Sequence, residues 1–325
     1  MTDRDREGNR LSARLNRYAS VGTGLGATAA RLAAGRMMTA TPNLGEEAKL
    51  FRATLGSLKG PLMKVAQLLS TIPDLLPPEY AEELRELQAQ APPMGASFVR
   101  RRMAAELGMG WQGKFRAFEQ TAAAAASLGQ VHKAANHDGA ALACKLQYPD
   151  MDSAVEADLR QFNLLLMIHR RLDGAIDTSE IGEEIGARLR EELDYEREAR
   201  HIGLYAAMLA DDAAIKVPRV LAALSTRRLL TMTWLEGAPL LAFRDNPLED
   251  RNLLAASLFR AWWQPFCRYG VIHGDPHLGN YSVYCENGRP AGVNLLDYGC
   301  IRIFPSAFVG GVVELYRGLQ RGDEA

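Results

Sequence analysis

The sequence predicts an α+β fold, because strand-like and helical patterns occur in separate runs along the chain. Short strand-like stretches lie at 115–118, 129–135, 140–147 and 228–234. Long helical patterns at 153–172 and 180–209 separate the last two stretches, and the chain after residue 248 is again largely helical. Strands that come first, long helices between them and a helical remainder are typical of this fold class.

Length and composition indicate a globular protein with a substantial core. The 325 residues are enough for two lobes or one large domain, and 47% of them are hydrophobic. The 38 basic and 39 acidic residues give a formal net charge of −1. Nucleic-acid-binding proteins usually carry a strong basic excess, so nucleic acid is not expected as a partner.

Cysteine usage and hydropathy bear on the compartment. The four cysteines form no CxxC pair, and the chain opens on a polar, charged segment that does not resemble a secretory signal. We therefore expect a reducing, cytoplasmic location. No apolar run reaches the roughly 18 residues of a membrane-spanning helix, so no segment is expected to span a membrane by itself.

The N-terminal part of the chain is predicted to be helical. Residues 19–38 are rich in Gly and Ala, with Gly22 and Gly26 in a GxxxG spacing. This segment is interpreted either as a small-residue helix that packs closely on a neighbour or as a helix for membrane-surface or dimer contact. Further helical patterns follow at 46–69, 79–90 and 98–107. Because proline cannot continue a helix, Pro92 and Pro93 predict a domain boundary near 92–97.

The segment from His273 to Asn280 carries the strongest chemical signal. Asp275 is followed five positions later by Asn280, on a predicted loop after an apolar helix. This spacing matches the catalytic loop of protein kinases, HRDxxxxN. There the aspartate accepts or orients the proton of the nucleophile, and the asparagine oxygen binds Mg²⁺. His273 and His277 flank Asp275 without a third ligand at zinc-like spacing, so zinc is not expected.

A second carboxylate follows at Asp297, directly after an apolar strand. Gly299 allows a sharp turn behind it, and Asn287-Gly288 predicts a β-hairpin between the two motifs. Asp297 thus occupies the place of the kinase aspartate that holds Mg²⁺ against the nucleotide phosphates, with Tyr298 where kinases have Phe. Either motif alone is weak, but together they predict a site for ATP and Mg²⁺.

Three upstream features suit nucleotide binding but have simpler explanations. Lys145, in an apolar strand, could contact phosphates with Glu198 as its partner; alone, it could equally be a solvated edge lysine. The charged run that contains Glu198 could be a solvated helix face. Glu236 ends a strand and could belong to a hinge that meets adenine, or simply mark the strand exit.

The stretch that would cover the phosphates is rich in alanine. Where kinases place glycines, the chain has Ala124, Ala125, Ala126 and Ser127. Glycine adopts positive φ freely, whereas alanine does so at a cost of about 1 kcal/mol. The segment is interpreted either as a stiffened nucleotide clamp or as a helical alanine stretch.

From about Leu11 to Phe304 the sequence resembles the UbiB/ADCK family of atypical kinases, which is associated with ubiquinone (coenzyme Q) biosynthesis. Lys64-Val-Ala-Gln67 resembles the family's KxGQ motif, the alanine stretch resembles its alanine-rich loop, and Glu192-Leu-Asp194 resembles its ExD motif. The resemblance implies a two-lobed protein-kinase-like fold with an N-terminal helical extension over the active site. The implied domains are an N-terminal extension at 1–95, an N-lobe at 96–236 and a C-lobe, expected to be short or incomplete, at 237–325.

The resemblance also implies roles for the extension. Lys64 and Gln67 share a face if they lie on a helix, and Lys64 would pair with Glu192 or Asp194 and block the groove for peptide substrates. Such proteins are ATPases or small-molecule kinases, with phosphorylation of proteins in trans suppressed. Ala66 replaces the glycine of KxGQ, which puts the close packing of that motif in question.

The leading hypothesis is therefore an Mg-ATP-dependent ATPase or atypical kinase that supports quinone-lipid synthesis. Expected partners are ATP, a lipid or quinone precursor and coenzyme Q biosynthetic proteins, with a peripheral position on the inner membrane surface. One alternative is a small-molecule phosphotransferase of the aminoglycoside or choline kinase type, which lacks the Lys64/Gln67 element. Another is a nucleotide-binding scaffold without catalysis.

Overall fold

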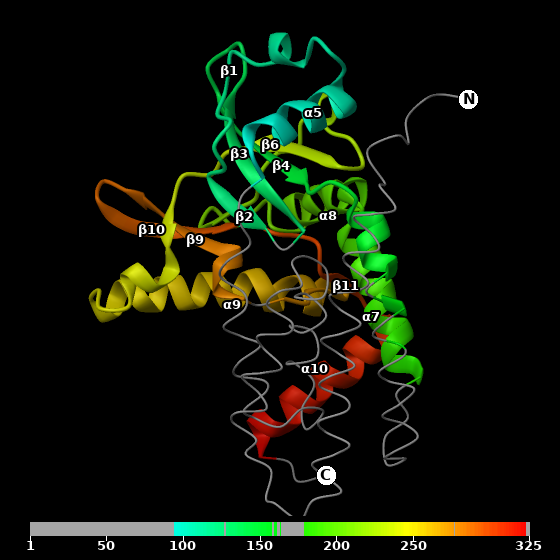
Figure 1. Ribbon diagram of the computed structural model, residues 1–325. Coiled ribbons are helices and arrows are strands. Elements are labelled where there is room, and N and C mark those ends of the chain that lie inside the picture. The colour runs from blue at the N-terminus through cyan, green and yellow to red at the C-terminus, as the bar shows by residue number, and fades with distance from the viewer. Residues whose placement is uncertain are drawn as a thin grey trace, which may run out of the picture. The chain divides into compact units, whose positions relative to one another are not determined.

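The computed structural model describes residues 94–126, 128–157, 159, 160, 163, 179–275 and 277–322. The chain divides into two compact units, 1–92 with 151–189, and 93–150 with 190–325. In the first unit the described residues are helical, at 151–157 and in most of α7 (Ser179–Glu192). All the sheets of the described residues belong to the second unit (Figure 1).

The second unit begins with a five-stranded antiparallel sheet. Its strands are β1 (Ala117–Phe118), β2 (Ala124–Ala126), β3 (Gly129–Ala135), β4 (Ala141–Gln147) and β6 (Leu229–Thr233). The order is β1-β3-β4-β6, and β2 pairs with β3 as well. Its central strand, β4, is an almost continuous apolar run and is buried along nearly its whole length.

Alternation along β4 gives the sheet two different faces. Leu142, Cys144 and Leu146 pack in a core with α5 (Ala96–Leu107). Ala143 points to the other face, into the core that contains α8 (Tyr195–Met208). Lys145 is two positions after Ala143 and therefore projects toward α8 as well.

A second sheet of four strands lies in the C-terminal half of this unit. Its order is β5 (Ile215–Lys216), β10 (Arg289–Leu295), β9 (Tyr281–Glu286) and β7 (Ala238–Pro239). As the sequence predicts, β9 and β10 form a hairpin, with positive φ at Asn287 and Gly288 in its two-residue turn. A short ribbon pairs β8 (Val271–His273) with β11 (Ile301–Ile303).

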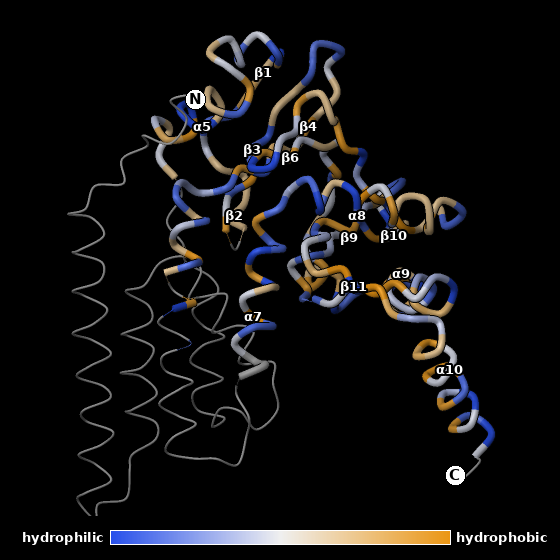
Figure 2. The backbone as a smooth tube through the Cα atoms, turned by 90° about the vertical axis from the view of Figure 1, so that its right-hand side faces the viewer, coloured by the Kyte–Doolittle hydropathy of each residue, from blue (hydrophilic) through white to orange (hydrophobic). Residues whose placement is uncertain are grey.

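Two long helices complete the unit. Helix α9 (Leu248–Tyr269) begins with an acidic first turn and ends at Gly270, whose φ of +70° suits a left-handed cap. Helix α10 (Ser306–Arg321) follows β11 and is amphipathic, with hydrophobic and hydrophilic residues alternating along it in Figure 2. The remaining elements are the 3₁₀ turns Trp111–Lys114, Ala222–Leu224, Leu240–Phe243 and Leu278–Asn280.

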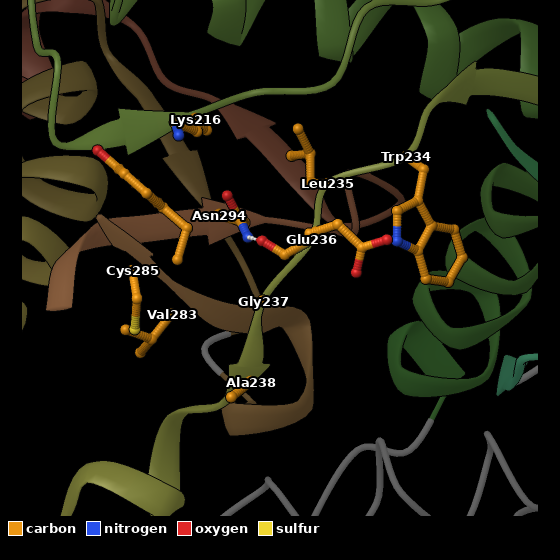
Figure 3. A pocket seen from close by; sticks show the side chains of 10 residues that line it. Lys216, Trp234, Leu235, Glu236, Gly237, Ala238, Val283, Cys285 and Asn294 are labelled. Carbon is orange, nitrogen blue, oxygen red and sulfur yellow. Dashed lines mark hydrogen bonds between the residues drawn. The ribbon is translucent and has the colours of Figure 1, made fainter. Parts of the chain in front are cut away.

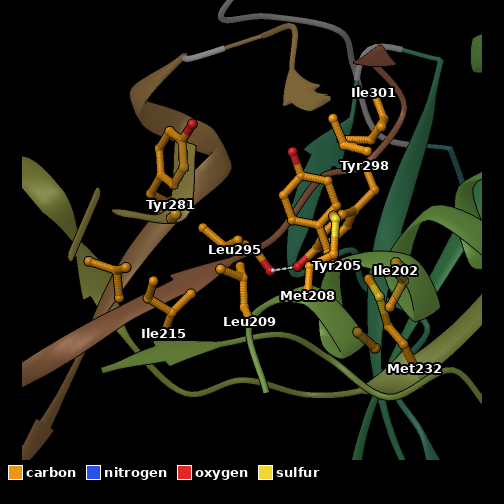
Figure 4. Close-up of a cluster of buried hydrophobic side chains, with 14 of the residues drawn as sticks. Ile202, Tyr205, Met208, Leu209, Ile215, Met232, Tyr281, Leu295, Tyr298 and Ile301 are labelled. Carbon is orange, nitrogen blue, oxygen red and sulfur yellow. Dashed lines mark hydrogen bonds between the residues drawn. The ribbon is translucent and has the colours of Figure 1, made fainter. Parts of the chain in front are cut away.

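The main core lies where α8, α9 and the four-stranded sheet meet. Its aromatic centre is formed by Tyr205 on α8 and Tyr298, which follows β10 (Figure 4). Both rings are fully buried. The core therefore fixes the end of β10, which Asp297 follows, relative to α8, which carries Glu198.

The structure revises several local predictions. The alanine stretch is a strand, β2, where a helix was one interpretation. The helix expected over 180–209 is divided into α7 and α8 by a break at 193–194. The helices expected at 19–38, 46–69 and 79–90, and most of the one at 153–172, lie outside the described residues. Within the described part of the chain, no helix combines the length and apolarity needed to cross a bilayer.

Candidate active site

Lys145 contacts its predicted partner Glu198 and, in addition, the predicted metal ligand Asp297. Its Nζ lies 2.7 Å and 3.0 Å from the two oxygens of Glu198, on α8, and 3.3 Å from Oδ2 of Asp297. Lys145 and Glu198 are buried, whereas the side chain of Asp297 is 34% exposed. The Lys145–Glu198 pair is therefore held inside the protein, whereas the carboxylate of Asp297 is partly accessible to solvent.

The charges around Lys145 determine its protonation state. Burial by itself would lower the pKa of Lys145, but the negative charges of Asp297 and Glu198 outweigh burial and raise that pKa well above its usual value. The side chain is therefore an ammonium at neutral pH. A buried ammonium held by a glutamate is suited to bind phosphate oxygens.

His273 links the predicted catalytic loop, residues 273–280, to the predicted metal loop, residues 297–299. The backbone N–H of Asp275 donates to Nδ1 of His273 at 3.2 Å, so the ring proton is on Nε2. That Nε2–H donates to the backbone carbonyl of Asp297 at 2.7 Å. Trp262, on α9, donates to the carbonyl of His273 at 3.1 Å. His273 is thus a positioning residue, a role that considering it only as a zinc ligand had missed.

Asn280 and Asp275 lie at opposite ends of one loop and are joined by a hydrogen bond. Its Nδ2 donates to the backbone carbonyl of Asp275 at 3.1 Å, and its own carbonyl accepts from Leu296 N–H at 2.9 Å. The amide nitrogen is therefore engaged, which leaves the amide oxygen as the atom suited to a cation. With the carboxylate of Asp297 this gives two oxygen donors, a set that suits Mg²⁺ because this ion keeps waters and phosphates as its other ligands.

Asp297 is held by the turn that follows it. Its Oδ1 accepts from the N–H of Gly299 at 2.8 Å, which leaves Oδ2 toward Lys145. A Cβ at Gly299 would lie 3.3 Å from Oδ1 of Asp297 and 3.8 Å from Cγ of Glu192. Glycine therefore keeps the turn open between the metal-loop aspartate and Glu192.

Comparison with known proteins assigns the chain to a family. The family model of the ABC1 atypical kinase-like domain matches residues 86–325. The chain belongs to the ABC1 atypical kinase-like family. Its α+β fold with kinase-like motifs, predicted from the sequence, is confirmed by this match.

Two curated relatives illustrate the family. The chain is 31% identical over 304 residues to the mitochondrial atypical kinase COQ8 of Saccharomyces cerevisiae, covering 91% of this chain and 60% of that protein. It is 32% identical over 268 residues to AarF domain-containing protein kinase 1 of Gallus gallus, covering 82% and 52%. The chain therefore spans between half and two thirds of the length of these relatives.

A solved structure supports the fold. The chain superposes on Rv3197 of Mycobacterium tuberculosis, determined in complex with erythromycin, with a TM-score of 0.60. The two sequences are 34% identical, and the match covers 84% of this chain and 69% of that one.

The alanines of the alanine-rich stretch in this ABC1 domain form strand β2, which pairs antiparallel with β3. Ala124 pairs with Val131 and Ala126 with Gly129, and Ser127 lies outside the described residues. Among the described residues, positive φ at non-glycine positions occurs only at Asp150 and Asn287, so Ala124 to Ala126 carry none of the expected strain. A Cβ at Gly129 would come too close to the carbonyl oxygen of Leu146, at 2.2 Å, so this glycine is required for close packing on β4.

The other predicted site residues do not contact the group formed by Lys145, Glu198 and Asp297 through any hydrogen bond described here. Asp194 caps α8, because its Oδ1 accepts from Arg197 N–H at 2.9 Å. The carboxylate of Glu236 is exposed and bonds Lys133 at 2.7 Å, which lowers the pKa of Glu236. Lys64 and Gln67 lie outside the described residues, so their pairing with the ExD motif stays a prediction.

Proposed function

We propose that this ABC1 domain binds Mg²⁺–ATP and transfers or hydrolyses its terminal phosphate. The observation that carries the proposal is the ammonium of Lys145, held between Glu198 and Asp297 at 2.7 Å and 3.3 Å. Protein kinases need this lysine–glutamate pair and the metal-binding aspartate in place together for phosphoryl transfer. The same three groups are assembled here by β4, α8 and the end of β10.

The roles follow from the chemistry of each group. Lys145 would hold the phosphates next to the nucleoside, with Glu198 keeping its ammonium in position. Asp275 would accept the proton of the attacking hydroxyl or water, and Asn280 and Asp297 would hold Mg²⁺. When bound, Mg²⁺ neutralises charge on the phosphate oxygens. Ala124, Ala125, Ala126 and Ser127 would cover the phosphates, and Glu236 would mark the segment that meets adenine.

ATP hydrolysis by Asp297→Asn tests the assignment. The substitution keeps the size of the side chain but removes the charge that a divalent cation requires. We expect hydrolysis to fall at least about 100-fold, the order found when one group that stabilises transition-state charge is removed. Asp245→Asn, which changes an aspartate that is 87% exposed, is the matched control and should hydrolyse ATP at the wild-type rate. Wild-type-like turnover by Asp297→Asn would contradict the proposal.

The biological setting is proposed to be ubiquinone biosynthesis at a membrane surface. The family assignment and the resemblance to UbiB/ADCK proteins support this setting. The partners would be a lipid or quinone precursor and coenzyme Q biosynthetic proteins, with a peripheral position on the inner membrane. Hydrolysis measured with and without anionic liposomes and a phenolic quinone precursor tests it. A flat response to both additions would contradict the setting but not the phosphotransfer site.

Suppression of protein phosphorylation in trans is proposed to depend on the N-terminal extension. Lys64 would pair with Glu192 or Asp194, with Gln67 on the same face of its helix. The position of Glu192 beside Gly299 supports a role for the ExD motif near the metal loop. We expect Lys64→Ala to gain phosphorylation of a generic protein substrate such as casein while retaining ATP hydrolysis. Absence of any such gain would contradict this role of Lys64.

A further inference from the structure

One face of α8 lies against the predicted metal loop. Glu198, His201 and Tyr205 are three and four residues apart on α8, so their side chains share this face. Glu198 holds the lysine that contacts Asp297, and Tyr205 packs on the ring of Tyr298 (Figure 4). His201 lies between them and is buried, yet the function proposed above gives it no role.

The ring of His201 is hydrogen-bonded to the backbone of the metal loop. Its Nδ1 lies 3.1 Å from the carbonyl oxygen of Tyr298, and because a carbonyl only accepts, the ring proton is on Nδ1. The preceding carbonyl, that of Asp297, accepts from His273 at 2.7 Å. Two buried histidines, one on α8 and one on β8, therefore hold two successive carbonyls of the loop.

A single peptide group, the one between Tyr298 and Gly299, takes part in two hydrogen bonds. A trans peptide group is planar, so its C=O and its N–H point in opposite directions. The carbonyl accepts from His201, and the N–H donates to Oδ1 of Asp297 at 2.8 Å. A rotation of this peptide group would break both hydrogen bonds together. The bond from His201 therefore also fixes the direction of the Asp297 carboxylate.

Gly299 makes such a restraint necessary. Glycine adopts φ of either sign at little cost, so it does not by itself fix the peptide group that precedes it. With Oδ1 held by the turn, Oδ2 of Asp297 is directed toward Lys145 at 3.3 Å. If the peptide group turned, the carbonyl of the buried Tyr298 would lose its donor, which costs free energy. The bond from His201 therefore favours one orientation of the carboxylate.

We propose that His201 is a positioning residue for the metal-binding carboxylate of Asp297. Its N–H holds the peptide group between Tyr298 and Gly299, and this group in turn holds Oδ1 of Asp297. His201 acts only through the peptide group and is not a catalytic residue. The effect on the metal–nucleotide complex rests on the function proposed above, whereas the effect on the peptide group does not.

The segment proposed to meet adenine should not depend on His201. This segment, residues 234–237, borders a cavity of about 440 Å³ (Figure 3), and neither His201 nor the metal loop lines that cavity. A change of affinity for a metal–nucleotide complex on substitution of His201 can therefore be attributed to the metal loop.

A pair of variants at His201 separates the hydrogen bond from packing. Asn and Leu are nearly isosteric, but the Nδ2 of Asn can take the place of the imidazole Nδ1 and donate to the carbonyl of Tyr298, whereas Leu has no donor. His137→Leu is the matched control. His137 also donates to a backbone carbonyl, that of Gly113 at 3.0 Å, but it is exposed and lies between β3 and β4.

Hydrogen exchange of the Gly299 amide reports on the peptide group without metal or nucleotide. Mass spectrometry of overlapping peptides from the full chain resolves this amide, and β9 (Tyr281–Glu286) is the internal reference for global unfolding. The amide should be protected in the wild-type protein. It should exchange about tenfold faster in His201→Leu, beyond any change in β9, because about one hydrogen bond is lost. In His201→Asn and His137→Leu it should stay near the wild-type rate.

The affinity for the Mg²⁺ complex of AMP-PNP, measured by calorimetry, reports on the metal ligand without turnover. Loss of a group that orients a metal ligand typically weakens metal affinity by about 10–100-fold. We expect His201→Leu to bind the complex about tenfold more weakly, and His201→Asn and His137→Leu to bind it like the wild type. Asp297→Asn, which removes the charged ligand itself, should lose the complex to a greater extent.

Three results would overturn the inference. The first is an unprotected Gly299 amide in the wild-type protein, which needs no variant and so decides the matter even where His201→Leu does not fold. The second is equal behaviour of His201→Leu and the wild type while Asp297→Asn loses the complex. The third is an equal loss in His201→Asn and His201→Leu, since only packing would then matter. Wild-type-like binding by Asp297→Asn would instead contradict the proposed function, and the exchange of Gly299 would still decide the role of His201.

Discussion

The ring of Tyr298 packs edge to face on the ring of Tyr205, with their centroids 5.5 Å apart. Tyr298 directly follows the metal-loop Asp297, and Tyr205 lies on α8, two helical turns after Glu198. This contact therefore links the position of one carboxylate to the position of the other. Because both rings are fully buried, a change in either should affect stability and site geometry together.

The two hydroxyls of this pair should respond oppositely to removal. Tyr298 Oη donates to the carbonyl of Leu295 at 3.2 Å, whereas Tyr205 Oη is buried without a partner among the described residues (Figure 4). We expect Tyr298→Phe to lower the free energy of unfolding by about 1 kcal/mol, and Tyr205→Phe to leave it unchanged or raise it by up to about 1 kcal/mol. Urea denaturation checks both variants. A loss of stability in Tyr205→Phe would contradict the assignment.

The buried ion pair of Lys145 with Glu198 should be more sensitive to loss of one partner than of both. Lys145→Met leaves Glu198 buried and uncompensated beside Asp297, which should destabilise the fold by about 3–5 kcal/mol. The double variant Lys145→Met/Glu198→Leu should recover much of that loss, since replacing a whole buried pair by apolar groups is often neutral. Thermal unfolding measures both effects, and an additive double variant would contradict them. Neither variant should hydrolyse ATP.

Acidification should destabilise the protein through His132. Gln130 accepts from Met94 N–H at 2.6 Å, so its amide nitrogen faces His132 Nε2 at 2.8 Å, and His132 Nδ1–H donates to the carbonyl of Glu119. Protonation of His132 at Nε2 would place its new N–H directly against the N–H of the Gln130 amide, so that neither could accept a hydrogen bond from the other. Burial accordingly lowers the pKa of His132 below its usual value.

The sign of this pH dependence follows from linkage. The neutral ring is favoured in the folded state, so its contribution is complete above the unfolded pKa of about 6.5 and is lost as the pH falls below it. The free energy of unfolding, measured from pH 7.5 to 5, should therefore decrease. His132→Gln, which cannot titrate, should show a shallower decrease. Burial also lowers the pKa of His201, so part of the slope should remain in that variant.

Alanine substitution should separate two kinds of glycine. In Gly237→Ala the new Cβ would meet Ser282 Oγ at 2.5 Å and Asn294 Nδ2 at 2.7 Å, which displaces the segment 234–237 between β6 and β7 and costs about 1–3 kcal/mol. At Gly203, inside α8, no described neighbour lies within 4 Å of the position that a Cβ would take, so Gly203→Ala should stabilise the helix by about 0.5–1 kcal/mol. Chemical denaturation of the two variants should give changes of opposite sign.

The candidate catalytic motifs could be located because their spacings in the sequence are short, whereas their catalytic roles stay predictions. Asp275 and Asn280 lie on one loop, and Asp297 follows a hairpin that Asn287-Gly288 indicates. The α+β class was also predictable, since strand and helix periodicities differ. The residues that could not be predicted act through contacts distant in sequence. His273 bridges two backbones, and Asn294 holds the carbonyl of Glu236 at a separation of 58 residues.

Local structure was predicted least well where propensity and tertiary context disagree. Three alanines favour a helix in isolation, but pairing with β3 makes Ala124–Ala126 a strand. The charged run at 192–198 reads as one continuous helix, yet Asp194 interrupts it by capping α8 with its side chain. The run 192–198 can therefore contain both solvent-facing charged residues and residues of the predicted site.

The trio around Lys145 has a consequence for charge balance. One ammonium faces two carboxylates, so Lys145, Glu198 and Asp297 together carry a formal charge of −1, and Asp275 adds a further negative charge nearby in the loop. A free nucleotide tetra-anion would meet net repulsion at such a centre. A divalent cation offsets that repulsion, and we therefore expect ATP and its metal to bind as one complex of reduced charge, with chelation of the metal abolishing nucleotide affinity.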